Sequence, residues 1–488
     1  MTAAAHGAAL NSSRTVVPLR SARGRGVLLA TVLGSGIAFL DGTVVNVALP
    51  VLGRELHAGM AGLQWTVDAY LLTLTALLLV GGSLGDALGR KKMFVVGLAW
   101  FAIASAACGF SPSIGALIAA RAVQGVGAAL LIPGSLAVLH ASFAEEEQGQ
   151  AIGLWSGLSG VTTAVGPLVG GWLIGVWSWR AVFYLNLPLV AAAIWSAQRC
   201  VPESRAPGRP RIDVPGAAAA TGGLAGTVYA LIQARTSGTV VAAAAVLGVL
   251  ALVGFVFVEL RRSSPMLPLE MFRSRQFSGA NAVTLAVYFA LGGATFLLVL
   301  HLQRVLGYSP LAAGAALTPV TVLLLLLSPA AGKLSGRIGY RSLMTVGPLL
   351  VAAGLALLAA VQRDSTYLRG VLPGIVVFGL GLATTVAPLT TAVLSSAEER
   401  YAGIAAAVNS AVARLAGLLA VAVLPLLAGI AADDPQSLVA GFGRAMSICA
   451  ALSAAGGVCA FVTLRTPLPQ RGATKASASA RTHRPSRP

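Results

Sequence analysis

The chain has 488 residues, of which 56% are hydrophobic and 10% are charged, and its mean hydropathy is +0.82. A soluble globular protein carries roughly 25% charged residues, so this composition excludes that class and indicates a polytopic membrane protein. The net charge of +18 would favour nucleic-acid binding in a soluble protein, but basic residues in a membrane protein orient the chain. We therefore expect no nucleic-acid partner.

Apolar segments of roughly 20 residues, long enough to cross a bilayer as helices, recur along the whole chain. Fourteen are predicted, at 27–48, 62–83, 93–111, 114–140, 149–175, 181–199, 214–234, 238–259, 276–302, 310–332, 342–361, 370–394, 402–430 and 438–464. The seventh and eighth are separated by a short, weakly polar break at 233–238, so they can also form one re-entrant hairpin. The predicted fold class is an all-α polytopic membrane protein.

Basic residues gather in alternate loops. One side of the predicted topology carries clusters of them at 20–25, 90–92, 199–211, 261–275, 333–341 and 465–487. Loops on the other side carry single arginines, such as Arg54 and Arg180. Because loops rich in Lys and Arg stay in the cytoplasm, both termini are predicted to be cytoplasmic. The first span is longer than the apolar part of a signal peptide, so we expect an uncleaved anchor.

A few ionisable side chains interrupt the apolar spans. Asp41 lies in the first span, Asp68 in the second, Arg121 in the fourth and Arg414 in the thirteenth. A charge in the bilayer costs at least about 2.5–3.5 kcal/mol, so such residues are retained mainly where they have a function. Burial and a nearby guanidinium shift the pKa of a carboxyl in opposite directions, and a carboxyl balanced between them can exchange protons near neutral pH. Asp41 can therefore bind either a proton or a cation, with Arg121 as a candidate partner.

Each of these charges also has a structural interpretation. Asp41, which we place toward the outer end of its span, can instead cap a neighbouring helix, and Arg121 can be a static clamp between helices. Asp68 lies a turn or two inside the outer boundary, where a hydrated vestibule explains it as well as coupling does. Arg414 is expected to bind lipid or neighbouring carbonyls rather than a substrate.

The loop after the second span combines glycines, an acid and basic residues. It contains Gly82, Asp86, Gly89, Arg90 and Lys91. Glycine permits a tight turn and close helix approach, and Asp86 can accept hydrogen bonds from the N-terminal amides of a neighbouring helix. The basic run alone is also explained as a solvated cytoplasmic loop. The whole string resembles the G-x-L-a-D-r-x-G-r-k motif of the major facilitator superfamily, which implies a conformational latch between two halves. A weaker copy at 332–341 is typical of an internally duplicated transporter.

Further strings narrow the resemblance to the fourteen-helix drug:proton antiporters of that superfamily. Residues 40–50 (LDGTVVNVALP) resemble the motif of the first helix in that family, and residues 121–129 (RAVQGVGAA) resemble the motif tied to proton transfer. Residues 179–188 fit the pattern W-R-x-x-F-x-x-N-x-P, which is frequent in the same family. The resemblance is dense in the first half of the chain and thin in the second.

The fifth span contains an efflux-associated signature of small residues and a proline. Its members are Gly153, Gly166, Pro167, Gly170 and Gly171. Glycine and proline permit close backbone contact and a bend in a membrane helix. The spacing predicts a hinge or gate on one helix interface, and plain small-residue packing is the alternative.

The resemblance implies a major facilitator fold, with two six-helix bundles and two helices inserted between them. The expected division is a cytoplasmic tail at 1–26, a first bundle at 27–199, a linker with the two extra helices at 200–260, a second bundle at 261–464 and a basic disordered tail at 465–488.

The resemblance also implies a function. Such a protein exports a small amphipathic compound, often cationic or aromatic, such as a drug or antibiotic, across the cytoplasmic membrane in exchange for protons. Proton coupling is expected at Asp41, Arg121 and Asp68. Candidates for the substrate cavity are Asn46, Trp65, Tyr70, Gln124 and Asn409.

The chain lacks the phosphate-cradling glycine loop of ATP-driven pumps. We therefore expect neither an enzyme nor a cofactor or metal, and a proton gradient supplies the energy. A monomer in the lipid bilayer is expected. The alternatives are an exporter of an amino acid, siderophore or other metabolite in the same fold, an uptake carrier, and a receptor that does not transport.

Overall fold

The computed structural model describes residues 16–205, 214–234, 238–261, 269–396, 402–430 and 435–465, and these form helices joined by short connections. The outer parts of both predicted tails, 1–15 and 466–488, and the middle of the break after the seventh span lie outside the described residues. Within the described part, 13 helices are long and apolar enough to cross a membrane. The 19-residue α9 (Val214–Ile232) supplies the remaining predicted span. The all-α prediction is confirmed.

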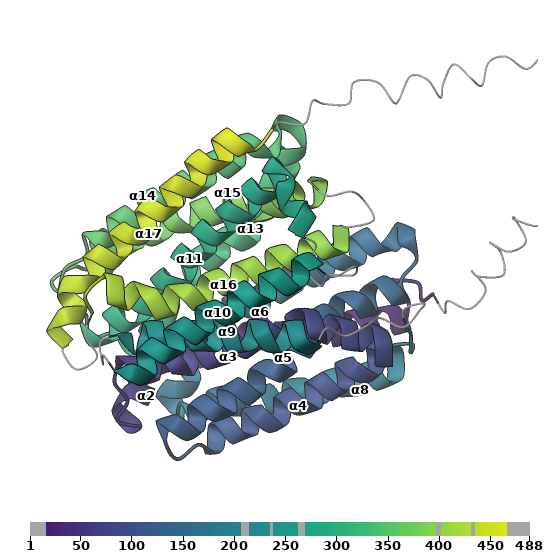
Figure 1. Cartoon of the computed structure of the whole chain (residues 1–488), viewed down its shortest axis with the longest axis horizontal. Helices are drawn as coiled ribbons and strands as arrows, with labels where there is room; N and C mark the ends of the chain where they lie inside the picture. The colour runs from purple at the N-terminus through teal and green to yellow at the C-terminus, as the bar shows by residue number, and fades with distance from the viewer. Residues whose placement is uncertain are drawn as a thin grey trace, which may run out of the picture.

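The first bundle contains the helices drawn in purple to blue in Figure 1. They are α2 (Ala22–Glu55), α3 (Met60–Leu88), α4 (Arg90–Phe110), α5 (Ile114–Ser142), α6 (Glu145–Val176), α7 (Arg180–Tyr184) and α8 (Asn186–Cys200). The short α7 and α8 together form the sixth span.

The second bundle contains the green to yellow helices in the upper part of Figure 1. Its members are α11 (Arg275–Arg304), α12 (Pro310–Ala316), α13 (Thr318–Ile338), α14 (Tyr340–Ala359), α15 (Leu372–Ser395), α16 (Ala402–Leu427) and α17 (Pro435–Thr463), with the single turns η2 (Leu269–Arg273) and η3 (Tyr367–Val371) before α11 and α15.

Several spans begin with a serine cap. Ser21 accepts a hydrogen bond from the amide of Gly24 (3.0 Å), and Ser274 and Ser309 do the same at α11 and α12. Such caps satisfy amides that the first helical turn leaves unpaired. This matters more in a bilayer, where no water is available to the backbone.

Two different carboxylates lie at the turn between α3 and α4. Asp86 makes an ion pair with Arg90 one turn later (2.8 Å). The N-terminal amides of α4, at Lys91 and Lys92, donate instead to the carboxylate of Glu203 (3.1 and 3.2 Å). The segment after α8 returns to the same end of the bundle and brings the carboxylate of Glu203 to the start of α4. Among the described residues Asp86 is paired with Arg90, and its bonding to the N-terminal amides of a neighbouring helix stays a prediction.

The two inserted helices, α9 and α10 (Thr239–Arg261), form a pair. α9 covers the seam between α3 of the first bundle and α16 of the second, where apolar side chains from all three helices pack together: Leu72, Val228, Ile232, Leu418 and Ala422. In Figure 1 both helices lie in front of this seam. The seventh and eighth predicted spans are thus two separate helices.

The bundles approach each other closely where α6 meets α12. A Cβ atom on Gly314 of α12 would collide with the carbonyl of Pro167 in α6, and one on Gly171 would lie 2.6 Å from the carbonyl of Pro310. In the opposite half of α6, Gly153 has open space around it. The bundles are therefore in backbone contact near the end of α6 and separate toward its start.

Side chains also join the bundles at this end. Gln64 of α3 donates to the carbonyl of Val421 in α16 (2.7 Å), and Gln303 of α11 donates to the carbonyl of Val47 in α2 (2.9 Å). Both glutamines are buried. Because these bonds fix how far along each other the facing helices lie, they set the register of the seam between the bundles.

Candidate functional site

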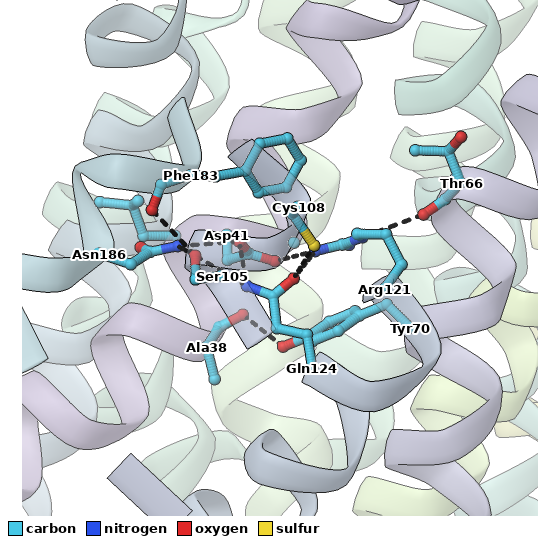
Figure 2. Close-up of polar contacts among 12 residues, drawn as sticks. Ala38, Asp41, Thr66, Tyr70, Ser105, Cys108, Arg121, Gln124, Phe183 and Asn186 are labelled. Carbon is cyan, nitrogen blue, oxygen red and sulfur yellow. Dashed lines mark hydrogen bonds and ion pairs between the residues drawn. The ribbon is translucent and has the colours of Figure 1, made fainter. Parts of the chain in front are cut away.

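A buried ion pair lies inside the first bundle, between Asp41 of α2 and Arg121 of α5 (Figure 2). Each side chain is only 1% exposed. Arg121 donates to Asp41 Oδ2, while the amide groups of Gln124 and Asn186 donate to Asp41 Oδ1 (2.9 and 3.0 Å). The carboxylate therefore accepts from two other helices, α5 and α8, and its charge is fully compensated.

The guanidinium of Arg121 is equally well satisfied. It donates to the side-chain oxygen of Gln124 (2.7 Å) and to the carbonyl of Thr66 in α3 (3.1 Å). Its carbon lies 4.3 Å from the centre of the Tyr70 ring and 5.9 Å from that of Phe183. A cation between aromatic faces gains about 0.5–2 kcal/mol when it is desolvated. This cluster ties α2, α3, α5, α7 and α8 together.

Further polar groups complete the cluster. Ser105 of α4 accepts from Asn186 (2.9 Å) and donates to the carbonyl of Phe183 (2.9 Å). Tyr70 donates to the carbonyl of Ala38 in α2 (2.9 Å). The sequence did not single out Ser105 or assign a role to Asn186, although Asn186 and Phe183 both belong to the W-R-x-x-F-x-x-N-x-P string, which was the available signal.

The position of Asp41 along its helix differs from the prediction. The first span does not end near residue 48 but continues through Pro50 to Glu55. Asp41 is therefore in the middle of α2 and not toward its outer end. The helix extends because proline is tolerated within a membrane helix when neighbouring groups satisfy the backbone.

Asp68 lies apart from this cluster. It is 0% exposed, and neither of its carboxylate oxygens has a hydrogen-bond partner. The ring of Tyr70, two residues further along α3, lies against Arg121, and residues two apart point to opposite sides of a helix. Asp68 therefore faces away from Arg121, toward the seam with α16, where Gln64 bonds to Val421. Its full burial does not support a hydrated vestibule.

Two residues that the sequence predicted to line the substrate cavity, Asn46 and Trp65, lie in the first bundle. Asn46 donates to the carbonyl of Gly42 in its own helix (3.3 Å), and its side-chain oxygen is buried without a partner. Trp65 packs against Tyr229 of α9, with ring centres 6.2 Å apart. Trp65 therefore lies on the side of α3 that the inserted helices cover.

The remaining candidates lie on α16. Asn409 donates to Thr284 and Asn281 of α11 (2.6 and 3.2 Å), so it joins two helices of the second bundle. The guanidinium carbon of Arg414 lies 5.8 Å from the centre of the Phe39 ring, and its Nε atom is buried without a hydrogen-bond partner. Arg414 thus reaches from the second bundle toward α2 of the first.

The glycines of the fifth-span signature lie at helix contacts, with one exception. A Cβ atom on Gly166 would collide with the hydroxyl of Thr43 in α2, and one on Gly170 would lie 3.3 Å from Val44. Gly171 contacts α12 as described above, whereas Gly153 contacts nothing. Small residues are therefore required at Gly166, Gly170 and Gly171, where α6 packs between α2 and α12.

Two helical bundles with a seam between them, a pair of inserted helices and buried charges inside the spans define a multi-pass membrane transporter and not an enzyme. The model of the Major Facilitator Superfamily matches residues 31–421. The chain belongs to this superfamily.

Comparisons with known proteins agree with this assignment. The chain is 36% identical over 422 residues to the tetracenomycin C resistance and export protein of Streptomyces glaucescens, covering 84% of this chain and 77% of that protein. It is 35% identical over 401 residues to the multidrug resistance protein Stp of Mycobacterium tuberculosis, covering 81% and 74%. It is 38% identical over 405 residues to the puromycin resistance protein of Streptomyces alboniger, covering 82% and 80%. These relatives are bacterial resistance and export proteins, consistent with a place in the cell membrane.

Solved structures show the same fold at low sequence identity. A bacterial homologue of the lysosomal transporter Spinster, in an inward-facing and unoccupied conformation, matches with a TM-score of 0.64 and 15% identity over 91% of this chain and 97% of that one. A D-xylose–proton symporter matches with a TM-score of 0.64 and 14% identity over 91% and 98%. The major facilitator fold predicted from the sequence is confirmed.

Proposed function

We propose that the protein exports small amphipathic compounds, including drugs or antibiotics, from the cell in exchange for protons. The names of its relatives support the substrate class. The observation that carries the coupling is Asp68, a carboxyl that is fully buried at the seam between the bundles with both oxygens unpartnered.

In this proposal Asp68 carries the transported proton. An ionised carboxylate buried without a partner is strongly disfavoured, so Asp68 is neutral in the present arrangement. When the bundles rock about the seam, as expected for alternating access, the carboxyl meets water or a cationic substrate and can release the proton. Both termini are cytoplasmic, so the contact between α6 and α12 closes the outer side.

Asp41 and Arg121 have a different part in the proposal. Their pair is saturated with hydrogen bonds and lies within one bundle. Such a pair holds α2 and α5 at a fixed rotation, and thereby positions the face of α3 that carries Asp68. Among the cavity candidates, Asn46 has a free buried oxygen and is the first choice for a substrate contact.

The test uses inverted membrane vesicles with an imposed pH gradient. The probes are ethidium, puromycin and tetracenomycin C, and the variants are Asp68→Asn, Asp41→Asn and the exposed Asp364→Asn as a matched control. Accumulation of a probe by the parent that collapses with the gradient is expected, with loss in Asp68→Asn and no change in the control. If the gradient drives no probe into vesicles of the parent, the proposed function fails. If Asp68→Asn keeps full gradient-driven accumulation, Asp68 is not the proton carrier.

A further inference from the structure

An acidic and a basic side chain lie on facing helices at the seam without pairing with each other. Asp68 of α3 has no partner for either oxygen, and Arg414 of α16 has none for its buried Nε. In place of an acid, Arg414 has the ring of Phe39 in α2 as a neighbour. Each charge is costly to leave alone in a membrane.

The register of the two helices places these residues at similar depths along the seam. The bond from Gln64 to the carbonyl of Val421 is a fixed reference. Asp68 follows Gln64 by four residues and Arg414 precedes Val421 by seven, so each lies on the same face of its helix as the reference. The helices run antiparallel, because Leu72, which follows Gln64, and Leu418, which precedes Val421, belong to the same apolar cluster. At 1.5 Å per residue, Asp68 and Arg414 are displaced from each other along the axes by roughly 4.5 Å, less than one turn.

The other charged or titratable groups next to α3 are already engaged or are not cations. From α5, Arg121 is paired with Asp41 of α2. From α4, Cys108 donates to Gln124. α9 brings Tyr229, which packs on Trp65. Within the described residues of α16, the basic side chain is Arg414.

We propose that Asp68 and Arg414 form an ion pair across the α3–α16 seam in the opposite conformation of the transporter. The inference rests on the proposed function. A slide of less than one helical turn brings the guanidinium to the carboxyl, and shifts of this size are typical of switching interfaces. The O–H bond of Asp68 breaks, the proton passes to water on the open side, and the carboxylate pairs with Arg414. Arg414 is thus a positioning residue that makes proton release depend on the bundle movement.

The first test is the pH profile of gradient-driven ethidium and puromycin accumulation in inverted vesicles. Without the cation, the carboxyl of Asp68 keeps its proton to higher pH. In Arg414→Gln the pH range over which probe accumulation rises is therefore expected to move by about one pH unit or more to higher pH. Arg414→Lys restores the profile, and Arg444→Gln, in the first half of α17 beside Gly429, leaves it unchanged. The double variant Asp68→Arg with Arg414→Asp is expected to accumulate at least tenfold more probe than either single variant. An equal loss at all pH values with no rescue by the swap overturns the inference.

The second test measures proximity without any substrate. Cysteines replace Asp68 and Arg414 in a chain whose four native cysteines are removed, and a protease site is introduced at 206–213. A short bifunctional methanethiosulfonate is expected to keep the two halves together after cleavage. The control pair joins Arg414→Cys with Thr73→Cys, because Thr73 faces α5 through its bond to Ala122. If the 68/414 pair cross-links no better than this control, the inference fails even where transport is intact. If the parent moves no probe, the proposed function fails and the cross-link still decides the proximity.

Discussion

Replacing Arg121 by methionine tests whether the buried ion pair anchors the first bundle. Methionine keeps most of the length of the side chain but removes the charge, the bonds to Asp41, Gln124 and Thr66 and the contact with the Tyr70 ring. Breaking a buried pair from one side costs about 3–5 kcal/mol, because the remaining charge is left uncompensated. Asp41 still accepts hydrogen bonds from Gln124 and Asn186 in this variant. We therefore expect the free energy of unfolding to fall by about 3 kcal/mol, the lower end of this range.

This loss can be measured as a melting temperature in detergent, followed by tryptophan fluorescence. With an unfolding entropy of about 2.1 cal/mol/K per residue over the whole chain, about 3 kcal/mol lowers the melting temperature by about 3 °C, and by more if a smaller unit unfolds. The control is Arg363→Met, an exposed arginine, which should change it by less than about 1 °C.

The double variant Asp41→Asn with Arg121→Met tests whether the uncompensated charge of Asp41 causes the loss of stability. Asparagine removes the stranded charge and can still accept from Gln124 and Asn186, so the double variant should melt above Arg121→Met alone. A double variant that is less stable than the single one would show that uncompensated charge is not the cause. An Arg121→Met protein that melts within about 1 °C of the parent would show that the pair does not anchor the bundle.

Two further predictions concern the helix ends. In Glu203→Gln the amides of Lys91 and Lys92 lose a charged acceptor worth about 0.3–1 kcal/mol, so their hydrogen exchange should accelerate by roughly two- to fivefold; unchanged exchange would mean that another group caps α4. In Gly314→Ala the added methyl group collides with the carbonyl of Pro167. A cysteine placed at Leu311 should therefore become more reactive to a water-soluble maleimide. The control is Gly160→Ala, where the added methyl group meets open space, and it should not change the reactivity of this cysteine. Equal labelling in both variants would show that the α6–α12 contact does not close this end.

The number and type of the helices followed from the sequence because hydropathy is a property of consecutive residues. A run of about 20 apolar residues in a bilayer has few alternatives to a helix, and all fourteen predicted segments are helical in the described residues. Asp41, Arg121 and Gln124 belong to strings that resemble family motifs, and this resemblance was enough to predict that they lie close together. Their contact is present in the structure.

Other features depended on how the helices are rotated and aligned, which local sequence does not specify. Asp41 and Asp68 look alike in the sequence, yet one accepts three hydrogen bonds and the other none, because they lie on helix faces that meet different neighbours. Glu203 accepts from the first amides of α4 because a segment more than 100 residues away returns to the start of this helix.

The sequence by itself therefore determined that this is a fourteen-span protein of the major facilitator type with a few buried charges. Only the tertiary structure decided which of those charges are paired. The separation of Asp68 from Arg121 and its place at the seam with α16 follow from the rotation of α3 and from its register against α16. Both are set by contacts such as Gln64 with Val421, between residues 357 positions apart, and such contacts have no local pattern in the chain.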